Sequence, residues 1–350
     1  MPSPADRSSA GSPAEEERQR PQPAGAARVR IEPGGEEFVV EGSETLLEAA
    51  LRAGHAVAYG CSSGNCGECR ARVVRGRVER LRAQDYRFRE AQKTEGWVLM
   101  CCVGAASDLV IEAPLAHGPR EIPVQSLVAQ VARKEFLSEH VLLLELLAPR
   151  SRRLRYLAGQ SAVLGIGGMR ATLPIASCPC EERRLHFHLG RLPDDPFHDY
   201  AFGRLGRGEA VTVEGPVGDF TLREEGARAL GFVAWGWQGF APVKSLVEHA
   251  LAQDPAPAVE LWWIAASAAE HYAPNLCRAW AEAMDGFRHT LFVAGRAAPG
   301  DAVARALADL AEPAARDWYV AGKRPEVEAL RAFLGVRGVA QEQIFTWSPP

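Results

Sequence analysis

Three cysteines lie close together in the run CSSGNCGEC, at Cys61, Cys66 and Cys69, and Cys101 follows in the run WVLMCCVG. A C-x4-C-x2-C group with one distant cysteine is the spacing of four thiolates that bind a [2Fe–2S] cluster. We expect one loop to carry three ligands and a returning strand to carry the fourth. The spacing therefore predicts a chain that handles electrons one at a time.

Two glycines, Gly64 and Gly67, interrupt this loop. Because glycine has no Cβ, its neighbours' backbone N–H groups can approach the sulfur atoms and donate hydrogen bonds.

Other roles of the cysteines agree less well with the sequence than a [2Fe–2S] cluster does. The N-terminus has no apolar run typical of a signal peptide, so a disulfide framework is not expected. Structural zinc sites prefer paired C-x2-C units, and a Rieske centre needs histidines beside the cysteines, whereas His55 lies upstream.

The surroundings of the cysteines contain a regular order of elements. The run VRIEPGGEEFVV predicts two strands around a Gly-Gly turn, and Thr45 with Glu48 forms a capping box that begins a helix ending at Gly54. With the strand SDLVIEAP after Cys101, residues 28–113 resemble a plant-type ferredoxin domain. In that family the last ligand precedes a Ser-Asp-Leu strand by a fixed short step. The resemblance therefore implies that Cys101 is the ligand and that Cys102 faces away.

Composition narrows the possible settings. The formal net charge is −4, which gives no reason to expect nucleic acid or an anionic membrane as a partner. No apolar run is long enough to span a bilayer. Residues 1–27 contain no Val, Ile, Leu or aromatic residue, so we expect a disordered tail, and its EEE run argues against a transit peptide. We expect a cytoplasmic protein.

The remaining chain divides into two patterns. Pro and Gly interrupt residues 114–124, which we interpret as a linker. Residues 125–225 contain strand-like runs separated by turn residues, which predict an antiparallel β-barrel. Residues 226–350 alternate short apolar strands with helical stretches and predict a doubly wound parallel α/β domain. The expected fold class is therefore multidomain, α+β and α/β, with a β-grasp ferredoxin domain as the resemblance implies.

Several runs resemble the ferredoxin–NADP reductase family, namely GQSAVL, VEGPVGDFTL, AWGWQGFAPVKSLVEHAL and YVAG. Ferredoxin domain, barrel and parallel sheet together resemble the reductase components of multicomponent oxygenases and CDP-6-deoxyglucoseen reductase-like proteins. The resemblance implies FAD in the barrel, NAD(P)H on the parallel sheet and the cluster as the electron exit.

The flavin motif of that family, R-x-Y-S, is altered. The segment MRATLPIASCP places Leu173 and Pro174 at its Tyr and Ser positions, and Pro has neither a hydroxyl nor an N–H to donate. Asp194 and Asp195 stand where the family has a pyrophosphate-binding turn, and they would repel a diphosphate unless they face solvent. The resemblance still implies four flavin-binding candidates: Arg170, Ile175, Ala176 and Ser177.

The nicotinamide loop is altered as well. Trp237 replaces a glycine of the family's G-G-T-G-I-A-P motif, where it could stack on a ring or fill the pocket. Ala266 stands where the family often has an arginine, which favours NAD over NADP. The candidates for nicotinamide binding are Gly236, Gly239, Pro242 and Gly322, with the turn into the next helix offering a phosphate site.

Two other features have simpler interpretations. Cys178 and Cys180 form a C-x-C pair that we interpret as small buried hydrophobic residues. The arginine-rich run RGRVERLRAQDYRFRE is expected to be a solvated face, and its place after the cysteine loop allows docking of an acidic electron acceptor.

Two functions follow. The first is an oxidoreductase that passes electrons from NAD(P)H through FAD to the cluster and on to a partner oxygenase or reductase. The second is an electron carrier or assembly protein that keeps only the [2Fe–2S] centre. The strand framework favours the first function, and the altered contacts favour the second.

Overall fold

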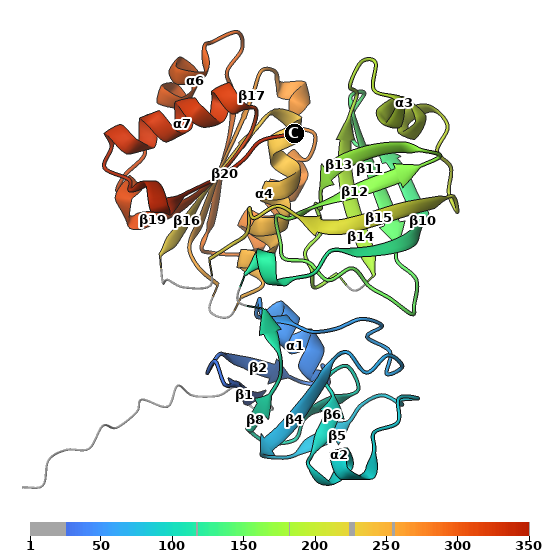
Figure 1. The fold of residues 1–350 in the computed structure, drawn as a ribbon. Helices are drawn as coiled ribbons and strands as arrows, with labels where there is room; N and C mark the ends of the chain where they lie inside the picture. Colours follow the sequence, from blue (N-terminus) through green and yellow to red (C-terminus); the bar gives the residue numbers. More distant parts are fainter. Residues whose placement is uncertain (1–25, 117, 182, 224–227, 254–255, 350) are drawn as a thin grey trace, which may run out of the picture.

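The computed structural model describes residues 26–116, 118–181, 183–223, 228–253 and 256–349, and it contains three larger sheets (Figure 1). The sheets follow one another along the chain, which confirms the expected fold class. The tail expected over residues 1–27 lies outside the described residues, except for Ala26 and Ala27, which begin the first strand.

The first sheet, here called the N-terminal sheet, has the strand order β2-β1-β8-β4-β6. Strands β1 and β8 are parallel and the other pairs are antiparallel, as in a β-grasp fold. Two short pairs, β3 with β9 and β5 with β7, flank it. The bounds are β1 Ala26–Glu32, β2 Glu37–Glu41, α1 Leu46–Arg52, β3 Ala56–Val57, β4 Arg70–Arg75, β5 Val78–Arg80, α2 Glu90–Thr94, β6 Trp97–Leu99, β7 Val103–Ala105, β8 Leu109–Glu112 and β9 Leu115–Ala116.

The expected capping box begins α1. The Thr45 Oγ1 accepts a hydrogen bond from the Glu48 N–H, and the Glu48 carboxylate accepts one from the Thr45 N–H at 2.9 Å. Arg82 also pairs with Glu48, at 2.6 Å. Burial raises the pKa of Glu48, but the hydrogen bonds from Thr45 and Arg82 outweigh it and lower the pKa below its usual value. The helix therefore starts at a fixed residue, and its apolar side packs into the core.

The second sheet, here called the curled sheet, is antiparallel throughout, with the order β13-β12-β15-β10-β11-β14. The sheet curls around a core of apolar side chains from alternating strand positions. The antiparallel barrel predicted from the sequence therefore corresponds to this curled sheet. The bounds are β10 Gln125–Phe136, β11 Val141–Leu147, β12 Ser161–Ile166, β13 Met169–Pro174, β14 Arg184–Gly190, α3 Pro196–Gly203 and β15 Ala210–Val217.

The third sheet, here called the parallel sheet, has the order β18-β17-β16-β19-β20, and every pair is parallel. One apolar cluster contains side chains of α4 and α5, and a second on the opposite face contains side chains of α6 and α7. The sheet is therefore covered on both faces, as expected. The bounds are β16 Ala229–Trp235, α4 Gly236–Leu251, β17 Val259–Ala265, α5 Pro274–Ala283, β18 Phe287–Val293, α6 Pro299–Ala306, β19 Arg316–Ala321, α7 Arg324–Val336 and β20 Ile344–Trp347.

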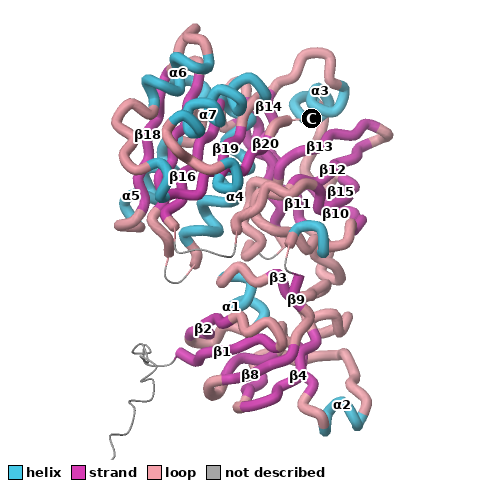
Figure 2. The backbone as a smooth tube through the Cα atoms, turned by 60° about the vertical axis from the view of Figure 1, so that its left-hand side comes forward, coloured by secondary structure: helices cyan, strands magenta, loops and turns pink. Residues whose placement is uncertain are grey.

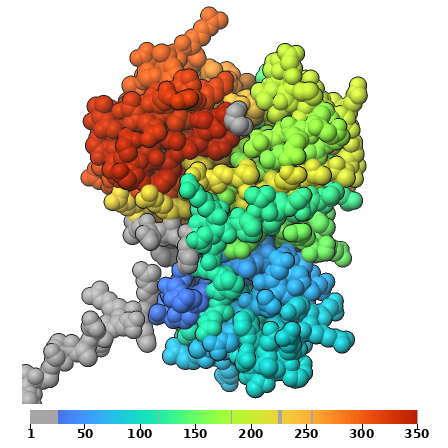
Figure 3. Space-filling model, viewed as in Figure 1, coloured from blue at the N-terminus to red at the C-terminus, as the bar shows by residue number. Residues whose placement is uncertain are grey.

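The N-terminal sheet lies below the other two, and α4 lies between the parallel sheet and the curled sheet (Figures 1 and 2). Figure 3 shows the blue and teal N-terminal part in contact with the green part above it. Hydrogen bonds cross this contact from Tyr59 Oη to the Leu154 carbonyl, at 3.2 Å, and from the Arg153 N–H to the Gly60 carbonyl, at 2.8 Å. Within the described part of the chain, every helix is too short or too polar to cross a bilayer.

Some elements differ from the sequence-based expectation. Strand β9 lies within the segment interpreted as a linker and pairs with β3. Helix α4 begins at Gly236, so the whole nicotinamide loop motif is helical rather than a turn before a helix. The sequence pattern was misleading because Gly and Pro usually mark turns, whereas here packing between the two sheets holds them in a helix.

We predict that Thr45→Ala weakens α1 locally. Loss of an N-cap costs about 1 kcal/mol, which corresponds to about fivefold faster amide exchange in Leu46–Arg52. Hydrogen exchange followed by mass spectrometry measures this directly. Ser43→Ala, which removes an exposed hydroxyl two residues earlier, is the control and should leave the exchange of α1 unchanged. Equal exchange in the two variants would contradict the role of the cap.

Candidate functional site

The four predicted cluster cysteines meet at one end of the N-terminal sheet. Cys61, Cys66 and Cys69 lie on the loop between β3 and β4, here called the cluster loop (residues 61–69), and Cys101 follows β6. Cys61, Cys69 and Cys101 are buried, and Cys66 is half-buried. The sulfurs form two pairs. The Cys69 and Cys101 sulfurs are 3.3 Å apart, and the N–H groups of Cys61 and Cys66 each donate to the other residue's sulfur, at 3.3 Å.

Backbone N–H groups point at these sulfurs. Those of Ser63 and Asn65 donate to the Cys61 sulfur at 3.4 and 3.3 Å, and that of Glu68 donates to the Cys66 sulfur at 3.4 Å. Burial raises the pKa of the Cys61 thiol, but these hydrogen bonds outweigh it and bring the pKa to about 7. These hydrogen bonds therefore favour the thiolate of Cys61, which is the form that binds iron, whereas burial raises the pKa of Cys66 and a hydrogen bond with Cys101 raises the pKa of Cys69.

The two loop glycines are required by close packing. Gly64 has φ +83°, and a Cβ there would lie 2.9 Å from the Ala83 carbonyl oxygen. Gly67 has φ +79°, and its Cβ would lie 2.2 Å from the Tyr86 ring. The arginine-rich segment after β4 therefore folds back over the cluster loop, and only glycine allows that approach.

Cys102 lies closer to the group than the resemblance implied. Its sulfur is 3.6 Å from the Cys101 sulfur and donates to the Ala83 carbonyl oxygen at 3.6 Å. Burial and the neighbouring Cys101 raise the pKa of Cys102 to about 12. Cys102 is therefore held as a neutral thiol beside the other four sulfurs.

The contact between the curled sheet and α4 contains three of the flavin candidates. Ile175, Ala176 and Ser177 follow β13 and are fully buried. The Ala176 carbonyl accepts from Lys244 Nζ at 3.0 Å, and the Ser177 carbonyl accepts from Ser245 Oγ at 2.7 Å. The carbonyls of Ala176 and Ser177 therefore hold α4 against the curled sheet.

Lys244 was missed by sequence reasoning. Its ammonium group is buried, and it is neutralised by Glu248 one turn later, at 2.7 Å. A Lys and a Glu four residues apart in a helix normally indicate a solvated surface, so the sequence carries no signal for this role. Burial of the pair follows from how the sheets pack.

The other flavin positions lie apart from these three. Arg170 is exposed near the start of β13 and pairs with Glu214 on β15 at 2.5 Å, so the structure does not bring it together with Ser177. Pro174 is buried at the end of β13. Asp195 caps α3 by accepting from the His198 N–H at 2.9 Å, and Asp194 is exposed with φ +63°. The acidic turn therefore faces solvent and starts a helix.

The nicotinamide candidates meet at the carboxyl ends of β16 and β19. A Cβ at Gly239 would lie 2.2 Å from the Ala321 carbonyl oxygen, and a Cβ at Gly322 would lie 2.8 Å from the Trp235 Cβ. Gly236 begins α4 with φ +61°. Pro242 lies inside α4 and is buried, one turn away from the glycines. The structure thus brings the three glycines together and places Pro242 in the helix core.

Trp237 crosses from α4 to the curled sheet. A Cβ at Gly190, the last residue of β14, would lie 2.3 Å from the Trp237 indole, so the ring fills the space above this glycine. The Tyr272 hydroxyl donates to the Trp237 carbonyl at 3.4 Å and contacts His188 Nδ1 at 2.8 Å. Burial lowers the pKa of His188 far below its usual value, so this imidazole is neutral. His188 and Tyr272 come from distant segments, and no sequence pattern indicates their contact.

The C-x-C pair corrects another expectation. Cys178 and Cys180 form a disulfide with a Cα–Cα distance of 5.2 Å, within the usual disulfide range, instead of serving as two buried hydrophobic residues. Cys178 is buried and Cys180 is exposed. The tight turn after Ser177 puts both sulfurs on the same side, which sequence spacing alone does not predict.

Comparison with known proteins agrees with this geometry. Residues 29–106 match the family model for a 2Fe-2S iron-sulfur cluster binding domain. The chain is 31% identical over 249 residues to the reductase component of a phenol 2-monooxygenase from Pseudomonas sp., covering 70% of this chain and 69% of that protein. It is 27% identical over 323 residues to a CDP-6-deoxy-L-threo-D-glycero-4-hexulose-3-dehydrase reductase of Yersinia pestis, covering 91% and 97%.

Among solved structures, an Amycolatopsis cytochrome P450 reductase superposes with a TM-score of 0.59 at 25% identity, covering 92% of this chain and 99% of that one. A ferredoxin reductase of carbazole 1,9a-dioxygenase, at 21% identity and a TM-score of 0.55, has the same fold over 92% and 97% of the two chains. The chain therefore belongs to the family of oxidoreductase components that join a [2Fe–2S] ferredoxin domain to a ferredoxin reductase-like pair of domains.

Proposed function

We propose that this chain takes electrons from NADH through FAD to a [2Fe–2S] cluster and delivers them to a partner oxygenase or reductase. The observation that carries the proposal is that three cysteines of the cluster loop and Cys101 after β6 come together in a chain that also contains the curled and parallel sheets. When bound, a nicotinamide supplies two electrons as hydride, a flavin holds one or two, and the cluster takes one.

The proposed cluster ligands are Cys61, Cys66, Cys69 and Cys101. The two sulfur pairs fit two irons with two thiolates each. The N–H groups around Cys61 and Cys66 would stabilise the charge on the thiolates.

The proposed flavin contacts are Arg170 and the segment Ile175–Ser177. This set offers few free polar groups, because Arg170 is paired with Glu214 and the carbonyls of Ala176 and Ser177 already bind α4. Pro174 has no N–H to donate. We therefore propose that FAD binds with fewer polar contacts than in relatives with the complete R-x-Y-S motif.

The proposed nicotinamide site is bounded by Gly236, Gly239 and Gly322, with Pro242 supporting it from within α4. It lies at the carboxyl ends of parallel strands, where open α/β sheets bind nucleotides. The position of Glu270 favours binding of NADH over NADPH. Its carboxylate accepts from the Ala266 N–H at 3.3 Å, just after β17, where it would repel a 2′-phosphate.

A second candidate function is that of an electron carrier or assembly protein that uses only the cluster. The observation that favours it is the Trp237 ring in the space above Gly190, between the curled sheet and α4. If the ring stays there, a nicotinamide would be kept away from this boundary. The reduction experiment below separates the two functions.

We propose an oxygenase component as the electron-accepting partner, on the basis of the similar proteins and of the charge near the cluster loop. The relatives named above include reductase components of oxygenases, and the arginine-rich segment over the cluster loop fits an acidic acceptor. We propose a cytoplasmic location, because Cys102 and Cys277, the two described cysteines outside both the proposed cluster and the disulfide, carry free thiols, as a reducing compartment maintains them. We also propose the domain bounds 28–113, 125–225 and 226–350, with 1–27 as a tail and 114–124 as a linker.

We predict that replacing Cys61, Cys66, Cys69 or Cys101 with Ser removes most of the bound iron and sulfide, because a thiolate ligand to iron is lost. Iron and sulfide counting measures this. Cys102→Ser and Cys277→Ser are the matched controls and should retain the cluster, since Cys277 is a buried thiol in α5. Retention in the Cys101 variant with loss in the Cys102 variant would overturn the ligand assignment.

We predict that Trp237→Gly speeds reduction by NADH by at least about tenfold, a change of about 1.4 kcal/mol in the barrier, because it empties the space above Gly190. Stopped-flow absorbance follows the flavin and cluster bands. Trp97→Gly, a half-buried indole of the N-terminal sheet, is the control and should leave the rate unchanged. If dithionite reduces both the wild type and the Trp237 variant but NADH and NADPH reduce neither, the carrier function stands instead.

A further inference from the structure

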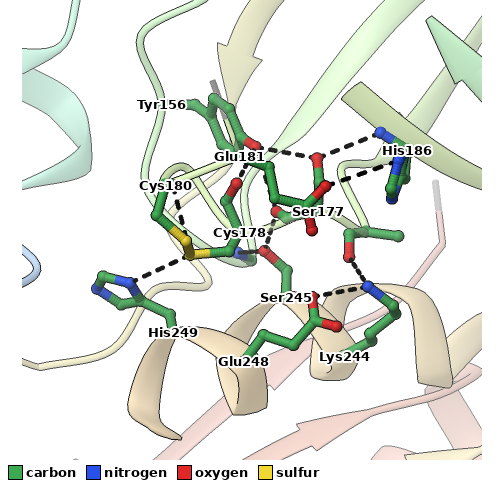
Figure 4. Close-up of a disulfide and its surroundings, with 12 residues drawn as sticks. Tyr156, Ser177, Cys178, Cys180, Glu181, His186, Lys244, Ser245, Glu248 and His249 are labelled. Carbon is green, nitrogen blue, oxygen red and sulfur yellow. Dashed lines mark hydrogen bonds and ion pairs between the residues drawn. A yellow bond between two sulfur atoms is a disulfide. The ribbon is translucent and has the colours of Figure 1, made fainter. Parts of the chain in front are cut away.

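The Cys178–Cys180 disulfide lies between the proposed flavin segment, residues 175–177, and a cavity lined by the proposed cluster ligand Cys101. It directly follows Ser177, whose carbonyl binds α4, and it lies beside α4 near His249 (Figure 4). On its other side is a cavity of about 250 Å³ at the contact with the N-terminal sheet. Cys180 and Ala252 line it from one side, and Ser62, Arg82 and Cys101 line it from the cluster loop side.

The two sulfurs of this pair are unequally exposed. Cys178 is 2% exposed, whereas Cys180 is exposed and lines the cavity. Thiol–disulfide exchange begins when a thiolate attacks an accessible sulfur along the S–S axis, and the other sulfur leaves. In this pair only Cys180 can be attacked from solvent, so Cys178 is the leaving sulfur.

The surroundings of Cys178 suit a leaving thiolate. The Cys180 N–H donates to the Cys178 sulfur at 3.4 Å, and such a bond stabilises negative charge on sulfur. His249 Nδ1 lies 3.8 Å from the same sulfur. The opposite edge of this imidazole faces Gly54, where a Cβ would lie 3.0 Å from Nε2. The ring is thus held between the disulfide and the end of α1, within reach of a proton exchanged with Cys178.

The other described cysteines differ from this pair. Cys102 and Cys277 carry free thiols, and Cys61, Cys66, Cys69 and Cys101 are the proposed cluster ligands. In a compartment that keeps thiols reduced, a disulfide is usually transient, catalytic or redox-sensing. A C-x-C disulfide with one exposed sulfur therefore fits a reversible site better than a structural crosslink, since it joins residues only two apart and closes almost no loop.

We propose that Cys178 and Cys180 form a thiol–disulfide exchange site that takes a dithiol as its substrate. A thiolate of the dithiol attacks the Cys180 sulfur, a new S–S bond forms between them, and the Cys178–Cys180 bond breaks. Cys178 leaves with the electron pair and takes a proton. The second thiol of the donor then attacks the donor's own sulfur in the mixed disulfide and releases Cys180.

The dithiol thereby supplies two electrons and two protons and becomes a disulfide, while the protein disulfide becomes two thiols. The exchange needs neither nicotinamide, flavin nor iron, so it is independent of the function proposed above. Because Cys180 and Cys101 line the same cavity, exchange alters the wall that faces the cluster loop.

The test uses the full chain and dithiothreitol as the probe. The folded protein is incubated with dithiothreitol, separated from it by rapid gel filtration and alkylated with N-ethylmaleimide at neutral pH without denaturant, and peptides are identified by mass spectrometry. We expect two added labels on the peptide that contains Cys178 and Cys180, and their loss after oxidised dithiothreitol is added. Cys277 is the internal control, because its buried thiol should stay unlabelled while the protein remains folded.

Three results would overturn the proposal: labelling of both cysteines without dithiothreitol, reduction only after unfolding, and failure to re-form the disulfide. The single variants test the order of attack without reduction. We expect Cys178→Ser, which leaves the exposed Cys180 thiol, to label at least about tenfold faster than Cys180→Ser, which leaves the buried Cys178 thiol. Equal rates with Cys277 still unlabelled would contradict the assignment of Cys180 as the attacked sulfur.

His249→Gln tests the role of the imidazole. We expect several-fold slower reduction by dithiothreitol, with His289→Gln, a half-buried histidine on β18, as the control that reacts as the wild type does. Cys277 labelling again reports whether the fold is intact. An unchanged rate in the His249 variant would remove the imidazole from the exchange step. The electron-transfer function is read separately from the flavin and cluster bands, so either proposal can fail alone.

Discussion

The docking of α4 on the end of β13 is the interaction on which the rest of the arrangement depends. Lys244 and Ser245 bind the carbonyls of Ala176 and Ser177, so the parallel sheet is fixed to the curled sheet at one buried point. A buried ammonium group is costly unless it is paired and hydrogen-bonded, and Glu248 and the Ala176 carbonyl meet both needs. Removing Glu248 would leave the Lys244 charge uncompensated at the boundary between the curled and parallel sheets.

The same docking explains the altered motifs. Residues that the family resemblance assigned to flavin binding are used here to hold a helix, and the indole of Trp237 occupies space above a glycine of β14. Protein side chains therefore fill the contact between α4 and the curled sheet, where the family resemblance implied bound cofactors. In contrast, the cluster loop and Cys101 together have two sulfur pairs, converging N–H groups and two glycines with positive φ.

The disulfide connects these two regions. Its first cysteine follows Ser177 at the docking point, and its second lines a cavity shared with Cys101. His249 lies on the far half of the docked helix and contacts both the disulfide and the end of α1. A change in the oxidation state of the pair would thus act beside the docked helix and the cavity shared with Cys101.

The sequence by itself determined the cysteine spacing, the capped helix at Thr45 and the order of the three sheets, because these depend on local spacing and on periodicity along the chain. It could not determine where Lys244, Trp237 and Cys180 lie, since their roles arise from segments far apart in sequence that meet only when the sheets pack. A Lys four residues before a Glu, a Trp in a glycine-rich loop and a C-x-C pair each have an ordinary local meaning. Only the tertiary structure decided that Lys244 is buried, that Trp237 packs against the curled sheet and that the C-x-C pair is a disulfide. The physical reason is that burial and solvent access depend on how the sheets pack against one another.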